Sequence, residues 1–91
     1  MEIEFDAAKS ERNLRERGLA FERAADFDFE TALYREDRRR EYGERRIRAL
    51  GYIEDRLYAL VYTIRGEALR VISLRRANRR EVRAYEEATR S

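Results

Sequence analysis

Arginine is the residue type with which this chain could do chemistry, and it is concentrated in one stretch. Residues 65–85 contain seven arginines and two acids, a local charge of 7 − 2 = +5, whereas the whole 91-residue chain has a net charge of +2. A guanidinium group stays protonated and presents a planar fork of donors that matches a phosphate. This stretch therefore predicts a surface that binds a polyanion such as RNA.

The residue types that are absent narrow the reaction class. The chain has no His and no Cys, which removes the commonest general acid–base residue and the usual ligands of zinc. We therefore expect no cofactor and no metal. If the polyanion is RNA and the chain cleaves it without a metal, the reaction needs a base for the 2′-OH proton and cations around the phosphate. Arginine can supply only the cations, and the sequence leaves the base open among Glu81, Lys9, Tyr85 and the substrate itself.

The candidate catalytic residues lie on predicted strands and on the helix that follows them. Arg70 and Arg75 occur in and just after a run that otherwise reads as buried, residues 69–74, and Arg46 lies on a neighbouring run. We expect Arg70, Arg75 and Arg76, with Arg46, to surround one phosphate. The predicted catalytic set is Arg70, Arg75, Arg46, Glu81 and Tyr85.

Other arginines are candidates for RNA binding on charge alone. Their positions along the last strands and the last helix leave two interpretations open, since a solvated helix face can meet either RNA or an acidic partner protein. Glu81 also fits a helix-capping role, and Tyr85 also fits a core aromatic. The predicted RNA-binding set from this region is Arg48, Arg65, Arg76, Arg79, Arg80 and Arg83.

Hydrophobic periodicity predicts the elements that position these residues. Strands are expected at residues 2–5, 31–34, 45–52, 56–64 and 68–74. Helices are expected from the N-cap Asp6 to Gly18, from Phe21 to about 29, and from 79 to 88, where Asn78 and Glu81 form a capping box. Residues 35–43, with the basic run 38–40, are expected to form a solvated loop.

This order, β-α-α-β-β-β-β-α, predicts one α+β domain spanning residues 1–91. It has a single antiparallel sheet, two N-terminal helices and one C-terminal helix. Helices are expected to leave one sheet face partly open, the face shared by Arg46, Arg48, Tyr58, Tyr62 and Arg70.

No apolar run approaches the ~18 residues that a membrane helix needs. The first twenty residues also carry acids, among them Glu2, Glu4, Asp6 and Glu11, where a signal peptide would be apolar. We expect a cytoplasmic protein without membrane contact.

Several motifs together resemble the BrnT family, small toxins of bacterial type II toxin–antitoxin pairs. The N-terminal match is Phe5-Asp6-Ala7-Ala8-Lys9, then Asn13-Leu14, Gly18, Phe21 and Ala24-Ala25. The middle match is residues 44–51. The most specific match is Val61-Tyr62-Thr63-Ile64-Arg65, then residues 69–77, then Glu81 and Tyr85. The chain departs from the family in having Phe5 in place of Trp, and Glu16-Arg17 in place of Lys-His.

The resemblance implies a RelE-like fold and an endoribonuclease that cleaves RNA and inhibits translation. It adds Lys9 and Arg17 to the predicted RNA-binding residues. It also implies a cognate BrnA-like antitoxin that binds DNA, so that DNA is contacted only through the complex. The alternative hypothesis, favoured by the missing family His, is a non-catalytic module that binds RNA or the antitoxin and has lost cleavage.

Overall fold

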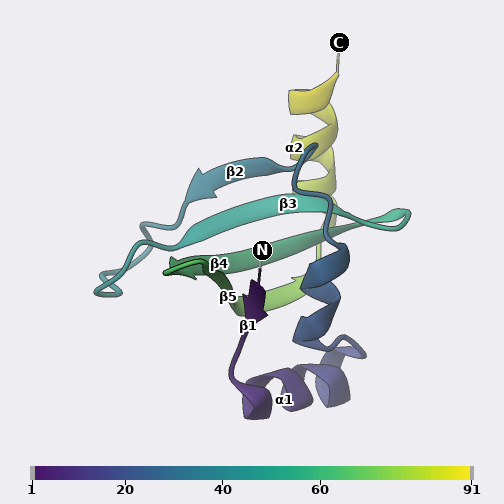
Figure 1. Cartoon of the computed structure of the whole chain (residues 1–91). Coiled ribbons are helices and arrows are strands. Elements are labelled where there is room, and N and C mark those ends of the chain that lie inside the picture. Colours follow the sequence, from purple (N-terminus) through teal and green to yellow (C-terminus); the bar gives the residue numbers. More distant parts are fainter. Residues whose placement is uncertain (1, 91) are drawn as a thin grey trace.

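A five-stranded sheet with the strand order β1-β5-β4-β3-β2 is the scaffold of the α+β fold. The computed structural model describes residues 2–90. Figure 1 shows α2 behind the sheet, with α1 and the short helix η1 on the opposite side. The elements are β1 (Glu2–Glu4), α1 (Ala7–Arg17), the 3-10 helix η1 (Phe21–Asp26), β2 (Leu33–Glu36), β3 (Ile47–Ile53), β4 (Arg56–Arg65), β5 (Ala68–Arg76) and α2 (Arg79–Thr89).

The sheet is mixed, so the prediction of a single antiparallel sheet was wrong. Strands β2 to β5 pair antiparallel, but β1 lies parallel to β5 at the edge, with Glu2 opposite Ala68 and Glu4 opposite Arg70. Consecutive strands joined by tight turns must be antiparallel. β1 is separated from β5 by the rest of the chain, so its direction is free of that constraint.

The second predicted helix is one 3-10 segment of six residues, which corrects the expected pair of N-terminal helices. Its buried residues Phe21 and Ala24, together with Phe27 just beyond it, recur every third position. That spacing matches the three residues per turn of a 3-10 helix. Ala20 offers no side-chain cap, so nothing at this end favours an α-helix instead.

The helix ends follow the local sequence signals and confirm those predictions. Asp6 accepts from the backbone N–H groups of Ala8 and Lys9, and Gly18 ends α1 in the left-handed region with φ 70°. At α2, Asn78 and Glu81 form both halves of the predicted capping box. No helix among the described residues is long and apolar enough to cross a membrane.

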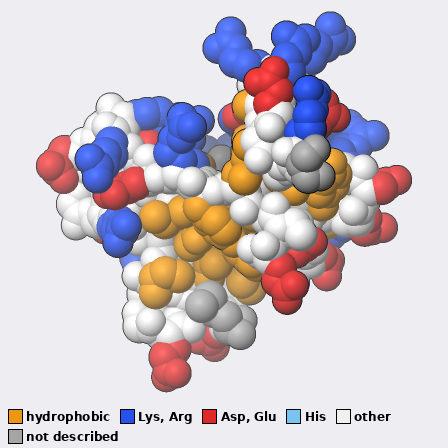
Figure 2. Space-filling model, turned by 90° about the horizontal axis from the view of Figure 1, so that it is seen from above, with side chains coloured by type: hydrophobic (Ala, Val, Ile, Leu, Met, Phe, Trp, Pro, Cys, Tyr) orange, Lys and Arg blue, Asp and Glu red, His pale blue; other side chains and the backbone are white. Residues whose placement is uncertain are grey.

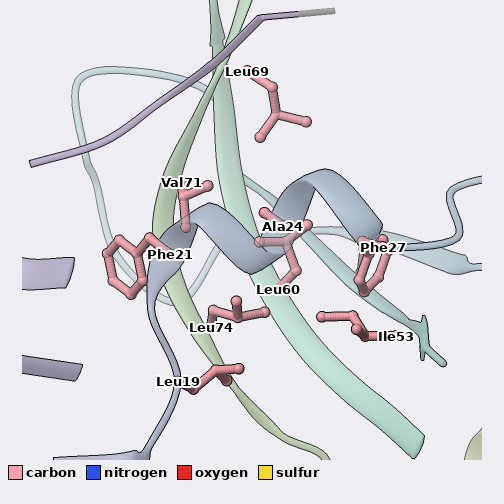
Figure 3. Packing of buried hydrophobic residues seen from close by; sticks show 10 residues of the cluster. Leu19, Phe21, Ala24, Phe27, Ile53, Leu60, Leu69, Val71 and Leu74 are labelled. Atoms are coloured by element: carbon pink, nitrogen blue, oxygen red, sulfur yellow. The ribbon is translucent and has the colours of Figure 1, made fainter. Parts of the chain in front are cut away.

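The core lies on the face of the sheet that η1 covers. Figure 3 shows this buried cluster, in which Phe21 and Phe27 lie on either side of Ala24, and Leu60 of β4 and Leu74 of β5 belong to the sheet below. Gly51 lies within β3, where the Phe27 ring leaves no room for a side chain. A Cβ at Gly51 would lie 2.5 Å from the Phe27 ring.

A β-bulge in β5 decides which side chains share each face. Val61 pairs with Ser73 but the next residue, Tyr62, pairs with Val71, so Ile72 is left without a partner. The extra residue shifts the alternation of side chains beyond it. Val71 and Leu74, an odd number of residues apart, therefore both reach the same core.

The expected open face was wrong in one respect. Arg48 lies opposite Val61 and Arg70 opposite Thr63, on the face toward α2. Tyr58 and Tyr62 are on the other face, packed against the core. The α2 helix is held over its face by Tyr85, whose ring meets Tyr52 edge-on at 5.6 Å.

Candidate functional site: an arginine-rimmed hollow

A hollow of about 530 Å³ separates α2 from the sheet face beneath it. We call it the arginine hollow. Its floor is apolar, formed by Leu33, Leu50, Val61 and Ile72, and Ala84 and Ala88 of α2 form a wall. The charged residues of the lining are six arginines and two acids, a local charge of 6 − 2 = +4: Arg35, Arg39, Arg46, Arg48, Arg75, Arg80, Asp37 and Glu81.

The basic and the apolar surfaces of the molecule lie next to each other. Figure 2 shows Lys and Arg side chains gathered on one side, beside an exposed apolar area. The exposed large apolar side chains include Tyr34 and Ile64, each about half exposed. Both belong to the face of the sheet opposite the arginine hollow, as their pairing with Ala49 and Leu69 shows.

Arg75 and Glu81 form the central pair of the arginine hollow. The two guanidinium nitrogens Nη1 and Nη2 donate to the two carboxylate oxygens at 2.8 Å each, so the pair is bidentate. Glu81 Oε1 also accepts from the Asn78 backbone N–H at 2.9 Å, as the capping box requires. The hydrogen bonds from Arg75 outweigh burial and lower the pKa of Glu81, while the same bonds raise the pKa of Arg75.

This geometry has a direct chemical consequence. Glu81 is ionised near neutral pH, which a proton acceptor must be, but each of its oxygens already accepts a hydrogen bond from Arg75. The Arg75 bonds make Glu81 a weaker base, and it becomes more basic when Arg75 turns to another anion. A phosphate is such an anion, since its oxygens match the same guanidinium fork.

Arg46 is fixed at the rim by two contacts. Its guanidinium carbon lies 4.1 Å from the centre of the Tyr42 ring, and its Nε donates to Glu44 at 3.0 Å. Glu44 also accepts from Arg65 at 3.3 Å, and the bond from Arg46 lowers the pKa of Glu44. Cation–π stacking and an ion pair together hold Arg46 in one orientation.

The loop after β2 contributes two residues that sequence reasoning missed, Asp37 and Arg39. The side chain of Asp37 is 1% exposed. It accepts from Arg39 Nε and Nη2 at 2.8 Å each, and from the Tyr42 hydroxyl at 3.2 Å. The Arg39 bonds lower the pKa of Asp37 and raise that of Arg39. The three arginines of the run 38–40 are exposed, as expected for a solvated loop, and Arg39 is in addition tied to Asp37 by these bonds.

Arg35 was missed because the predicted strand ended too early, at residue 34. If the predicted strand is extended to residue 36, the alternation of side chains puts Arg35 on the same face as Leu33. This alternation is the sequence signal that could have identified Arg35. Arg35, Arg48 and Arg80 line the arginine hollow without an ion pair to any described residue. These three are the arginines most available to a phosphate.

The structure brings together five residues of the predicted sets: Arg46, Arg48, Arg75, Arg80 and Glu81. The expectation that Arg70, Arg75, Arg76 and Arg46 surround one phosphate was wrong. Arg70 pairs with Glu4 at 3.5 Å, five residues and about 16 Å along the strand from Arg75. Arg76 lies opposite Tyr58, on the other face of the sheet.

The remaining predicted residues lie outside the arginine hollow. Tyr85 is a buried core residue whose hydroxyl donates to the Thr31 carbonyl at 2.8 Å. Arg65 is paired with Glu44 at the end of β4. The others lie exposed on the two α-helices: Lys9, Arg17, Arg79 and Arg83.

Comparisons with known proteins bear on the identity of this chain. The family model described as the ribonuclease toxin BrnT of type II toxin–antitoxin systems matches residues 5–81. Searches of curated proteins and of solved structures found no match, so the RelE-like part of the expected fold stays a prediction. The matched range holds the whole arginine hollow except its α2 wall at Ala84 and Ala88. The chain therefore belongs to the BrnT family, the ribonuclease toxins of type II toxin–antitoxin systems, and its expected partner is a protein antitoxin.

Proposed function

We propose that this chain is an endoribonuclease that binds and cleaves RNA in the arginine hollow and thereby inhibits translation in the cytoplasm. The observation that supports it is the convergence of six arginines with one ionised carboxylate, Glu81, above an apolar floor. Arginines of three strands and a helix meet here although their charges repel, and such an arrangement suits a polyanion. The apolar floor suits an unpaired base, whose ring faces are apolar.

In the proposed reaction, the substrate phosphate takes Arg75 away from Glu81. Arg75, Arg48 and Arg80 then neutralise the charge that builds up on the phosphate oxygens. The freed Glu81 takes the proton from the ribose 2′-OH, and the 2′-oxygen attacks phosphorus. The P–O5′ bond breaks, a water molecule gives a proton to the 5′-oxygen, and the hydroxide that remains takes the proton back from Glu81. The products are a 2′,3′-cyclic phosphate and a 5′-OH end.

We propose that this cleavage is independent of metal ions. The chain has no His or Cys, and no group of three or more acidic side chains among residues 2–90 is arranged to hold an ion. Positioning and fixed arginine charge would then supply the catalysis. A chelator should leave the rate unchanged.

For the partner, we propose a BrnA-like antitoxin with an acidic segment that orders over the arginine hollow and blocks it. An acidic segment complements the charge of +4, and apolar side chains in it would cover the floor. DNA binding would belong to the antitoxin, so that only the complex recognises a promoter.

The second candidate function is a binding module without cleavage. The observation that favours it is that Arg75 and the helix cap together give Glu81 three hydrogen bonds, so the residue already has a structural role. In this case the hollow would bind RNA or the antitoxin, and Glu81 would only hold α2 in place.

Variants tested in the purified, antitoxin-free chain separate these proposals. We expect Arg48→Ala and Arg75→Ala to lose at least tenfold in cleavage of a fluorescent single-stranded RNA. Arg12→Ala, an exposed arginine of α1, is the matched control. Arg70→Ala should also retain activity, because Arg70 lies outside the hollow. Equal losses in Arg70→Ala and Arg48→Ala would contradict the assignment of the site, and binding without cleavage by the parental chain would favour the binding module.

A further inference from the structure

A second basic hollow, also of about 530 Å³, lies on the opposite face of the sheet at the end of β5. The C-terminal end of α1 and the strand pair β4–β5 form it. Arg17, Arg23, Arg76 and Tyr58 line it, and Glu16 is its one acid. Arg23 is engaged with Glu54 at 2.8 Å.

Arg17 and Arg76 differ from Arg23 in having no ion-pair partner among residues 2–90. Neither makes an ion pair with any residue in the described part of the chain. Arg76 lies directly across from Tyr58 in the strand register. It does not stack on that ring, since the arginines that stack on an aromatic ring among the described residues are Arg40 and Arg46. The position of Arg17 at the end of α1 is favoured by the helix dipole, but that effect does not account for Arg76.

The two hollows are adjacent through the backbone of β5. Arg75 lines the arginine hollow and Arg76 lines the second one. Successive strand residues point to opposite faces while their Cα atoms are only about 3.8 Å apart. β4 pairs with one edge of β5 at both arginines. On the other edge β1 pairs only from Ala68 to Arg70, so that edge is left unpaired by any described strand where these two arginines occur.

We propose that the second hollow is a phosphate subsite for the same RNA strand, which crosses the end of β5 between Arg75 and Arg76. Arg17 and Arg76 hold a backbone phosphate two or more nucleotides away from the cleaved one, and the Tyr58 ring lines the floor below it. This inference rests on the proposed function, because it assigns the ligand of the arginine hollow to RNA. It makes the RNA footprint extend over both faces of the sheet.

The test compares RNA lengths. Binding is measured by fluorescence anisotropy with 2′-O-methyl oligonucleotides, which cannot be cleaved, of about four and about twelve nucleotides. We expect Arg17→Ala and Arg76→Ala each to weaken binding of the longer RNA about fivefold. Each should also reduce the magnitude of the log–log salt slope of that binding by about 0.7, the value for one phosphate contact. Both variants should bind the short RNA as the parental chain does, since it fills only the arginine hollow. Arg12→Ala, on the same helix as Arg17, should bind both lengths normally.

Three outcomes would overturn the subsite. In the first, Arg17→Ala and Arg76→Ala weaken binding of the short and the long RNA equally. In the second, Arg12→Ala weakens binding of the long RNA as much as they do, and in the third, they weaken antitoxin binding and leave RNA binding unchanged. Failure of the proposed function is recognised separately, because the parental chain would then neither bind the short RNA nor cleave its unmodified form.

Discussion

The substitution Glu81→Gln separates the two roles that the structure gives to Glu81. Glutamine keeps the shape of the side chain and an oxygen that can accept from the Asn78 N–H, so the capping box survives. It cannot act as a base at neutral pH. A purely structural Glu81 and a catalytic Glu81 therefore predict different results for this one change.

The expected stability loss follows from the contacts. The variant loses one of the two hydrogen bonds from Arg75. In the bond that remains, the acceptor is a neutral amide oxygen instead of a charged carboxylate oxygen. Charge-assisted bonds contribute about 1.5–3 kcal/mol and neutral ones about 0.5–1.5 kcal/mol. The side chains of Arg75 and Glu81 are 33% and 15% exposed, so solvent reduces the difference. We expect a loss of about 1 kcal/mol, which lowers Tm by about 4–8 °C in a chain of this size.

The expected kinetic loss is much larger. Removing a general base costs about 10²- to 10⁴-fold in rate. Phosphate binding should stay equal or tighten, because Arg75 is released from its carboxylate. The assay is single-turnover cleavage of a fluorescent RNA, with binding measured separately on an uncleavable analogue.

Two controls belong to this experiment. Glu86→Gln changes an exposed acid on the same helix and should alter neither rate nor stability. Asn78→Ala removes the other half of the capping box and should destabilise α2 by about 0.5–2 kcal/mol while cleavage is retained well below Tm. A Glu81→Gln variant that cleaves within about threefold of the parental rate would refute the role of Glu81 as base.

Three further predictions concern stability and binding. Gly51→Ala should lower the free energy of unfolding by about 1–3 kcal/mol through overpacking, since its Cβ would lie 2.5 Å from the Phe27 ring; an unchanged denaturant midpoint would contradict this packing. The pKa values of Asp37 and Glu81 are lowered from 3.8 and 4.5 in the fold, so their stabilisation is present above those values and is lost as pH falls below them. Thermal melts should therefore be level from about pH 6 to 5 and fall below about pH 4.5, and Asp37→Asn should flatten the fall. Binding of single-stranded RNA should show a log–log salt slope of about −2 to −3.5, the value for three to five phosphate contacts; a slope near zero would exclude an electrostatic site.

The features that the sequence alone determined, such as the helix ends, depend on interactions between residues close together in the chain. The ends of both α-helices depend on side chains within three or four residues, such as Asp6 and the Asn78–Glu81 box. Such contacts are visible in the order of residues, and they formed as expected. The concentration of arginine and the absence of His and Cys are likewise properties of composition. They narrowed the chemistry to an anion-binding site before any fold was known.

Tertiary structure decided which arginines meet. A shift of one residue in a strand moves every later side chain to the other face, and the bulge at Ile72 is such a shift. No local pattern marks it, because it results from how β4 and β5 pair over the core. The site also depends on Asp37 and Arg39, which belong to a loop whose place is set by long-range contacts. The Asp37 N–H donates to the Arg46 carbonyl at 2.8 Å, nine residues further along the chain.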